Sequence, residues 1–397
     1  MTPTQTRELE QVPTLRLLSY AYFTFICYLT IGLPLAVLPS LVHFDLGYST
    51  VIAGLVISVQ YIATLVSRPT VGHFSDRRGA RPAVIGGLGT GALTGAMLLV
   101  AGMAAPHSRM IALLVLIASR LLLGIAESLT STGSTLWSIA ANGSGNTAKI
   151  IGYNGVSTYG GMALGAPLGV WLNNRWGLGG IGVFVLAIGM VSMVVAMRKP
   201  ATAIHHGKHL PIRAIFQRVL MHGTVLALGG VGFSELATFV TLYYVNRHWE
   251  GAALCLTAFG IAFMLTRLLF INTIALFGTF AVATVSLGVE LAGLFLIWSA
   301  HSPTVALAGS ALTGFGFSLV FPAIGLEVVK QVPVQNRGAA LGIYTGFVDI
   351  SFFLTGSTSG AIIGWFGYGA IFVFAMIAVI MALGFVLLLM NQARQAT

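Results

Sequence analysis

Long apolar runs follow one another along almost the whole chain of 397 residues, and they exclude most folds. A helix that crosses the hydrocarbon core of a bilayer needs about 20 consecutive, mostly apolar residues. Cutting the sequence at polar residues, prolines and glycines leaves runs at about 17–42, 50–74, 82–104, 110–133, 148–173, 177–197, 219–245, 252–277, 280–300, 304–329, 338–364 and 367–390. Charged side chains make up 8% of the chain, against about 25% in soluble proteins. The sequence therefore predicts an all-α membrane protein with twelve transmembrane helices.

The longest clearly polar stretch inside the chain separates the first six runs from the last six. It predicts an N-terminal six-helix half at 1–197, a linker at 198–213 and a C-terminal half at 214–397. The halves resemble copies of one another, because the segment from Ala53 to Arg68 matches the segment from Ala252 to Arg267 at an offset of 199 residues. Duplicated six-helix units are typical of transporters whose substrate site lies between the halves, near the middle of the bilayer.

The cationic residues predict the orientation of the chain, because Lys and Arg in short loops stay on the cytoplasmic side of a membrane. If the N-terminus lies inside, the outer loops hold three cations, which are Arg109, Arg175 and Arg247. The inner segments then hold fourteen, which are Arg7, Arg16, Arg77, Arg78, Arg81, Lys149, Arg198, Lys199, Lys208, Arg213, Arg218, Lys330, Arg337 and Arg394. We expect a multi-pass protein with both termini in the cytoplasm. The net charge of +10 is explained by this orientation, so we expect no nucleic-acid partner.

The segment after the second run, from Gly72 to Arg81, carries a recognisable motif. Glycines at the ends of a short turn let two helices approach closely, and an Asp at a helix end pairs with Arg or with a neighbouring helix N-terminus. The segment resembles the G-x-x-x-D-R-x-G-R signature of the major facilitator superfamily, which is matched by Gly72, Asp76, Arg77, Gly79 and Arg81. The resemblance implies the two-half fold of that superfamily, with a cytoplasmic latch here that closes in the outward-facing state. The second half lacks the motif, so we expect an asymmetric latch.

Two further motifs resemble elements of the same superfamily. Arg120 to Gly124 resembles its R-x-x-x-G element, whose arginine is often tied to proton coupling, and Glu127 lies on the same helical face as Arg120. The fifth run resembles the antiporter signature of proton-driven exporters, with one residue inserted, through Gly152, Gly161, Gly165, Pro167 and Gly169. These glycines also suit close helix packing, which carries no information about the direction of transport.

Acidic residues inside apolar runs are candidates for proton coupling. An ionised side chain in a transmembrane segment is costly, so it usually faces the bundle interior or a wet cavity. A carboxyl group in such a low-dielectric site can load and release a proton. The candidates for coupling are the acids Glu127, Glu235 and Asp349, together with Arg120 of the R-x-x-x-G element. By analogy with the superfamily, Glu127 and Glu235 lie on helices that line the central cavity.

Each of these groups also has a structural interpretation. Asp349 can form a gating pair with Arg68, and Arg120 can cap a carbonyl or pair with an acid. We expect Glu290 to be a buried structural acid that forms a hydrogen bond. We expect Glu327 to form an ion pair with Lys330 at the cytoplasmic end.

Aromatic residues in the spans offer a lining for the cavity. The candidates are Tyr28, Tyr61, Trp137, Tyr243 and Tyr344, and such a lining would suit an amphipathic substrate. Packing between helices is the alternative.

The sequence contains no motif of an enzyme. It has no His-Glu-x-x-His, no phosphate-binding lysine loop, and only two cysteines, Cys27 and Cys255, both in apolar runs. We expect a protein that is not an enzyme and needs no metal or other cofactor, with a proton gradient as its energy source.

These observations favour a proton-coupled antiporter that exports a small amphipathic molecule by alternating access. The segments 28–39, 133–137 and 317–322 resemble the YhhS/YfcJ group of bacterial transporters. That resemblance implies a location in the bacterial inner membrane and a role in export. We expect a monomer in the lipid bilayer, with a small-molecule substrate as its partner. A proton symporter that imports a sugar or an organic acid is the alternative, because it would use the same fold.

Overall fold

The structure is a computed structural model that describes residues 13–143, 146–202, 211–333 and 336–395, without the side chains at 73, 76, 148, 338 and 357. The helices are α1 (Thr14–Leu35), α2 (Leu38–Ser40), α3 (Thr50–Arg78), α4 (Ala80–Ala104), α5 (Arg109–Glu127), α6 (Gly133–Asn142), α7 (Thr147–Arg198), α8 (Ile212–Asn246), α9 (Ala253–Phe270), α10 (Thr273–Phe277), α11 (Thr279–Trp298), α12 (Pro303–Lys330), α13 (Arg337–Phe366) and α14 (Ala370–Gln395). Two π-helical turns, Leu41–Asp45 and Ser128–Thr132, continue α2 and join α5 to α6. An all-helical fold suits a chain in lipid, where each segment must satisfy its own backbone hydrogen bonds.

The described part contains eleven helical segments that are long and apolar enough to cross a membrane. One of them is α7, whose 52 residues would extend about 78 Å as a single helix, more than twice the hydrocarbon thickness. Its backbone breaks at Gly177, where φ is 65° and ψ is −170°. Because a right-handed helix cannot continue through this conformation, α7 comprises two spans. The predicted twelve crossings are thereby confirmed.

Local sequence signals account for several helix ends. Ser49, Ser108 and Ser302 precede α3, α5 and α12, and each hydroxyl accepts a hydrogen bond from a backbone N–H in the first turn of its helix. Gly79 ends α3 with a φ of 89°, and its counterpart Gly278 ends α10 with a φ of 86°. Only glycine adopts this backbone conformation without strain. The same turn chemistry therefore recurs at matching positions of the two halves.

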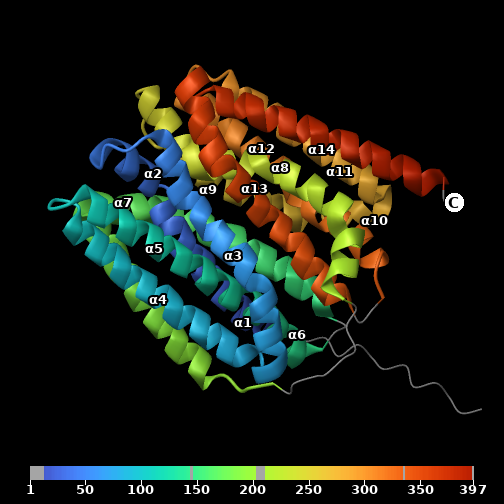
Figure 1. Cartoon of the computed structure of the whole chain (residues 1–397). Coiled ribbons are helices and arrows are strands. Elements are labelled where there is room, and N and C mark those ends of the chain that lie inside the picture. The colour runs from blue at the N-terminus through green and yellow to red at the C-terminus, as the bar shows by residue number, and fades with distance from the viewer. Residues whose placement is uncertain (1–12, 144–145, 203–210, 334–335, 396–397) are drawn as a thin grey trace, which may run out of the picture.

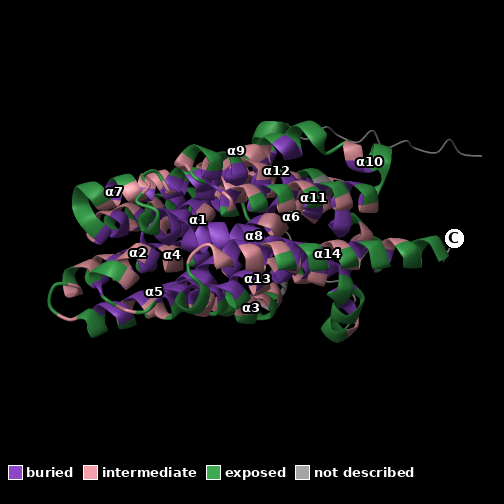
Figure 2. Cartoon of the chain, turned by 90° about the horizontal axis from the view of Figure 1, so that it is seen from above, coloured by how far each residue is buried: buried purple, intermediate pink, exposed green. Residues whose placement is uncertain are grey.

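The helices form two groups, α1 to α7 and α8 to α14, which lie on opposite sides of the molecule (Figure 1). Figure 2 shows buried residues concentrated along α1 and α8, in the middle of the bundle. The most apolar window is 83% buried in the span that includes α1 and 89% buried in α8, whereas it is 33–61% buried in the other spans. Exposed apolar side chains on the outer helices suit contact with lipid. The boundaries of the linker stay a prediction, because residues 203–210 lie outside the described part.

Two pairs of helices make most of the contacts between the groups, α3 with α13 and α7 with α9, and we call these contacts seam A and seam B. In seam A the Ser58 hydroxyl donates to the carbonyl of Phe352 over 3.1 Å. In seam B the Thr257 hydroxyl donates to the carbonyl of Ala163 over 2.9 Å. Ser58 and Thr257 are related by the same 199-residue offset that the sequence shows. The internal repeat is thus expressed as two similar interfaces between the groups.

The glycines of the antiporter-like motif pack α7 against α1. A Cβ atom built at Gly161, Gly165 or Gly169 would meet backbone atoms of residues 25–33 at less than the closest normal contact distance. A Cβ atom at Gly152 would meet no atom within 4 Å. Small residues of this kind let two helix backbones approach closely in a membrane. The last three glycines of the motif therefore have a packing role in this fold.

We expect Gly169→Ala to destabilise the protein, because the added methyl group would collide with the carbonyl of Leu33. Overpacking of this kind typically costs about 1–3 kcal/mol. Thermal unfolding in detergent measures the effect. Gly152→Ala is the matched control in the same helix and should cause no loss of stability. Equal unfolding temperatures for the two variants would contradict the packing role of Gly169.

Candidate functional site: a central cavity

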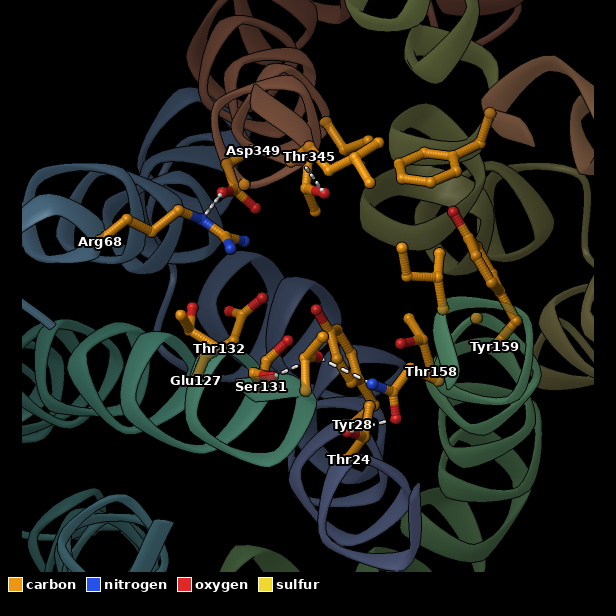
Figure 3. Close-up of a pocket in the computed structure, with 18 of the residues that line it drawn as sticks. Thr24, Tyr28, Arg68, Glu127, Ser131, Thr132, Thr158, Tyr159, Thr345 and Asp349 are labelled. Carbon is orange, nitrogen blue, oxygen red and sulfur yellow. Dashed lines mark hydrogen bonds and ion pairs between the residues drawn. The ribbon is translucent and has the colours of Figure 1, made fainter. Parts of the chain in front are cut away.

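A cavity with a volume of about 210 Å³ lies between the two groups of helices. Its lining comes from α1, α3, the segment from α5 to α6, α7, α8, α9, α12 and α13. Figure 3 shows labelled side chains of α1, α3, the segment from α5 to α6, α7 and α13 directed into a common space. The first, fourth, seventh and tenth spans all contribute to this lining. A cavity enclosed by both halves is of the kind that binds small molecules rather than polymers.

The cavity extends toward one end of the bundle and is closed at the other. We call the first the basic end, because it carries exposed cations, among them Arg77, Arg78, Lys330 and Arg337. The lining reaches this end at Thr147, the first residue of α7, and at Gly342, which is exposed. At the opposite end the Thr50 hydroxyl donates to the carbonyl of Gly360 over 2.8 Å, and the Thr241 hydroxyl donates to that of Ala36 over 3.1 Å. Access to the cavity is therefore from the basic end.

An ion pair crosses seam A at the edge of the cavity. Arg68 Nε donates to Asp349 Oδ2 over 2.7 Å, and the two side chains are 13% and 5% exposed. Figure 3 shows this pair between α3 and α13, with the rest of the guanidinium directed into the cavity. One of its nitrogens, Nη2, is buried and has no hydrogen-bond partner in the described part. The pairing of Asp349 with Arg68, which the sequence offers as one alternative, is confirmed.

Glu127 lines the cavity at the point where the fourth span changes from α-helix to a π-helical turn. The residue is 1% exposed, and its Oε2 accepts hydrogen bonds from the Gln60 amide over 3.0 Å and from the Thr64 hydroxyl over 3.1 Å. Single π-helical turns inside α-helices are frequent at functional sites. Here the turn places Ser131 and Thr132 beside Glu127 in the lining (Figure 3). No cation forms an ion pair with Glu127 in the described part.

A polar cluster on α1, α6 and α7, which is absent from the sequence predictions, also belongs to the site. The Thr24 hydroxyl donates to Asn154 Oδ1 over 3.2 Å, and Asn154 Nδ2 donates to the Thr135 hydroxyl over 2.7 Å. All three residues line the cavity. Asn154, and also Gln60 beside Glu127, carry amide side chains inside apolar spans. Polar side chains are rare in such spans, and this is the sequence signal that could identify them.

Two of the five aromatic candidates line the cavity, namely Tyr28 and Tyr61. Tyr61 stacks on Phe352 across seam A with a centroid distance of 4.1 Å. Tyr159, which was not among the candidates, also lines the cavity and stacks on Phe263 across seam B at 3.7 Å. The aromatic lining therefore links both seams to the cavity.

The expectation of a cavity lining is wrong for Trp137, Tyr243 and Tyr344, which are absent from the lining of this cavity. Trp137 stacks on Phe23, and its indole N–H donates to the carbonyl of Pro200. The Tyr243 and Tyr344 hydroxyls donate to carbonyls of neighbouring helices. All three belong to spans next to the cavity, but they lie on faces that pack against other helices. Periodicity alone does not determine which face of a helix that is apolar all round meets the cavity.

Glu235 and Arg120 are fully buried, but neither lines the cavity. Phe233 lines it from α8, and Glu235 lies two residues later, about 200° further around the helix. There Glu235 accepts a hydrogen bond from the Ser359 hydroxyl of α13. Arg120 lies two turns before Glu127 toward the opposite end, and its guanidinium has no hydrogen-bond partner in the described part. Their roles in proton coupling stay predictions.

The latch motif lies at the basic end. Arg77 and Arg78 are exposed, and Arg81 donates a hydrogen bond to the carbonyl of Met197, near the end of α7. The side chain of Asp76 lies outside the described part. Nearby, Lys330 and Glu327 form the expected ion pair over 2.7 Å, and Glu327 also accepts a hydrogen bond from Thr279. The function of the motif as a latch stays a prediction.

We expect Asp349→Asn to destabilise the protein by about 3–5 kcal/mol, because it leaves the buried Arg68 guanidinium unpaired. Adding Arg68→Gln should recover part of this loss. Lys330→Gln breaks a pair whose lysine is exposed, so it should cost no more than about 1 kcal/mol. Thermal and denaturant unfolding in detergent of these three variants, and of Arg68→Gln alone, checks this order. Additive effects of Asp349→Asn and Arg68→Gln would rule out a direct interaction between them.

Two solved structures have the same fold. The human organic anion transporter MFSD10 (TETRAN) superimposes with a TM-score of 0.67 at 17% identity, covering 95% of this chain and all of that one. A variant of the nucleoside transporter NupG superimposes with a TM-score of 0.73 at 14% identity, covering 94% and 99%. At these identities the likeness concerns the fold alone.

Relatives are found at much higher sequence identity. An uncharacterised MFS-type transporter of Burkholderia pseudomallei (strain 1106a) is 48% identical over 365 residues, which cover 92% of this chain and 89% of the relative. Another, of Pseudomonas aeruginosa (strain UCBPP-PA14), is 47% identical over 394 residues, covering 99% and 98%. The family model of the Major Facilitator Superfamily matches residues 21–289 and 250–396. The arrangement of the helices, the central cavity and these matches together identify the chain as a transporter of the Major Facilitator Superfamily.

Proposed function

We propose that this transporter exports a small amphipathic molecule in exchange for protons, and that Glu127 takes up and releases the proton. The observation that carries the proposal is the position of this carboxyl group: it faces the cavity and forms no ion pair in the described part. Of the other coupling candidates, Asp349 is paired with Arg68, and Glu235 and Arg120 lie away from the lining. Glu127 is therefore best placed to exchange a proton with the cavity.

The coupling mechanism uses the ion pair of seam A. In Figure 3 the guanidinium of Arg68 points from Asp349 toward the side of the cavity that holds Glu127. An ionised Glu127 attracts Arg68 and competes with Asp349 for it, and a protonated Glu127 does not. Protonation thus strengthens the link between α3 and α13, and loss of the proton weakens it. In this way the charge on Glu127 biases the rocking of the two halves.

Alternating access follows from the two ends of the cavity. The closed end is held by short contacts of seam A, such as Thr50 with Gly360. We propose that the chain lies in the bacterial inner membrane with its basic end and both termini in the cytoplasm, since cations favour that side. The structure then corresponds to the inward-open state. In the outward-open state the basic end closes, with the motif from Gly72 to Arg81 at the contact.

A proton symporter for a sugar or an organic acid is the second candidate. It is favoured by the packing of Gly161, Gly165 and Gly169 against α1, which explains the antiporter-like motif without reference to direction. Inside-out vesicles without a preset gradient separate the two candidates. Substrate added outside makes the lumen alkaline if protons leave in exchange, and acidic if protons enter with the substrate. Ethidium, chloramphenicol, phenylacetate, lactate and xylose provide a first panel of cationic, neutral and anionic probes.

We expect Glu127→Gln to abolish flux driven by a pH gradient while it preserves substrate binding and counterflow, because glutamine imitates the protonated carboxyl group. The measurement uses purified protein in liposomes, with any probe that the wild-type protein transports. Glu290→Gln is the matched control, since Glu290 is a fully buried acid away from the cavity lining. Coupled flux at the wild-type level in Glu127→Gln would exclude this residue and leave Glu235 as the next candidate.

A further inference from the structure

The cavity contains a second arginine, Arg267 of α9, which the proposed mechanism does not use. The residue lines the cavity and is 7% exposed. Its guanidinium lies over the ring of Phe263, 4.6 Å from the centroid, and Nη2 donates to the carbonyl of Ser318 over 2.7 Å. Nε is buried without a hydrogen-bond partner, and no carboxylate forms an ion pair with Arg267 in the described part. Arg267 is thus a cation in the wall of the cavity that is fixed by a hydrogen bond but has no ion-pair partner in the described part.

The internal repeat shows what is missing beside Arg267. Arg68 packs near Gly346 of α13 and pairs with Asp349, three residues further along that helix. The repeat relates Arg68 to Arg267, and it relates α13 to α7 at an offset of 191 residues, as in the pair Gly165 and Gly356. By this offset Gly155 corresponds to Gly346, and the Arg267 guanidinium indeed lies against Gly155.

The residue that corresponds to Asp349 is Thr158. It lines the cavity, and Figure 3 shows its side chain directed into it. Seam B therefore repeats the arginine and the glycine of seam A without the acid. Threonine brings no charge, so the counter-charge for Arg267 has to come from elsewhere.

The remaining charges of the lining do not supply it. The only other acidic and basic side chains in the described lining are Arg68, Asp349 and Glu127. The first two neutralise each other, and Glu127 interacts electrostatically with that pair. Tyr159, beside Arg267 in the lining, is neutral and supplies no counter-charge. An unpaired charge away from water is costly, and an anionic group within reach of the guanidinium would remove this cost.

We infer that Arg267 binds the carboxylate of a monoanionic substrate whose apolar body lies against the aromatic wall of the cavity. This inference rests on the proposed function and names the substrate class. The body would contact Phe321, whose ring centroid lies 5.9 Å from the Arg267 guanidinium, and also Tyr159 and Phe233, which pack on each other in the lining. A guanidinium matches a carboxylate through two parallel hydrogen bonds. The hydrogen bond from Nη2 to Ser318 orients the group, and Nε has no hydrogen-bond partner in the described part. One unpaired cation suits one negative charge, not two.

Equilibrium binding to the purified protein in detergent tests the inference without any proton gradient. The probes are 4-phenylbutyrate, indole-3-acetate and octanoate, each with its neutral amide, and acetate as a carboxylate without an apolar body. We expect each carboxylate to bind the wild-type protein at least tenfold more tightly than its amide, and acetate to bind more weakly than all three. Thermal shift and calorimetry report the binding.

The variants separate charge recognition from folding. Arg267→Gln should remove the preference for the carboxylate and leave the affinity for the amide unchanged. Thr158→Asp keeps the arginine and supplies the missing acid, so it should cause the same loss. Arg247→Gln is the matched control, because Arg247 lies over Tyr243 and Trp249 at the opposite end. It should keep the preference.

The inference is overturned if no carboxylate binds the wild-type protein, if amides bind as well as carboxylates, or if Thr158→Asp retains the preference. Flux experiments in liposomes distinguish a failure of this inference from a failure of the proposed function. A carboxylate preference without proton-coupled flux would refute the coupling alone. Proton-coupled flux of neutral or cationic probes without a carboxylate preference would refute the role of Arg267 alone.

Discussion

The cost of a charge in hydrocarbon is the constraint on which the rest of this structure depends. An ionisable side chain within a span is stabilised when it is paired, hydrogen-bonded or turned toward a cavity, and the charged groups around the central cavity meet this condition. Arg68 and Asp349 satisfy one another across seam A, and Glu127 is held by Gln60 and Thr64. The positions of these groups bring α3, α13 and the fourth span together around one space. These charged groups of the cavity therefore share one wall because each meets the same requirement.

Close backbone packing makes the two seams possible. Glycines at their contact points let helices of different halves approach until hydroxyls reach carbonyls of the other half, as in the bond from Ser58 to Phe352. The seams share this construction because the halves are related by an internal repeat. They differ in one acidic residue: seam A has Asp349, whereas seam B has Thr158. A nearly symmetric scaffold thus carries an asymmetric distribution of charge, which is the basis of both proposals.

The sequence predicted the parts of the site that rest on rare residue types. A buried acid and a buried arginine in facing spans are expected to meet, and Asp349 and Arg68 do. Glu127 was identified for the same reason, and it lines the cavity. The aromatic residues were predicted less well, because tyrosine and tryptophan are common in helix packing. Tyr159 was missed and Trp137 was wrongly placed, since nothing in their local sequence distinguishes a cavity face from a packing face.

By itself the sequence determined the number of spans, the helix ends at Ser49, Ser108 and Gly79, and the internal repeat. These depend on local hydropathy and turn chemistry, which a short segment already contains. Only the tertiary structure decided which face of each helix meets the cavity, that Glu235 points at Ser359 instead, and that the cavity opens at the basic end. Such features depend on the rotation of each helix about its axis and on contacts between residues some 200 to 300 positions apart, such as Ser58 and Phe352. Packing over that separation leaves no periodic signal in an apolar helix.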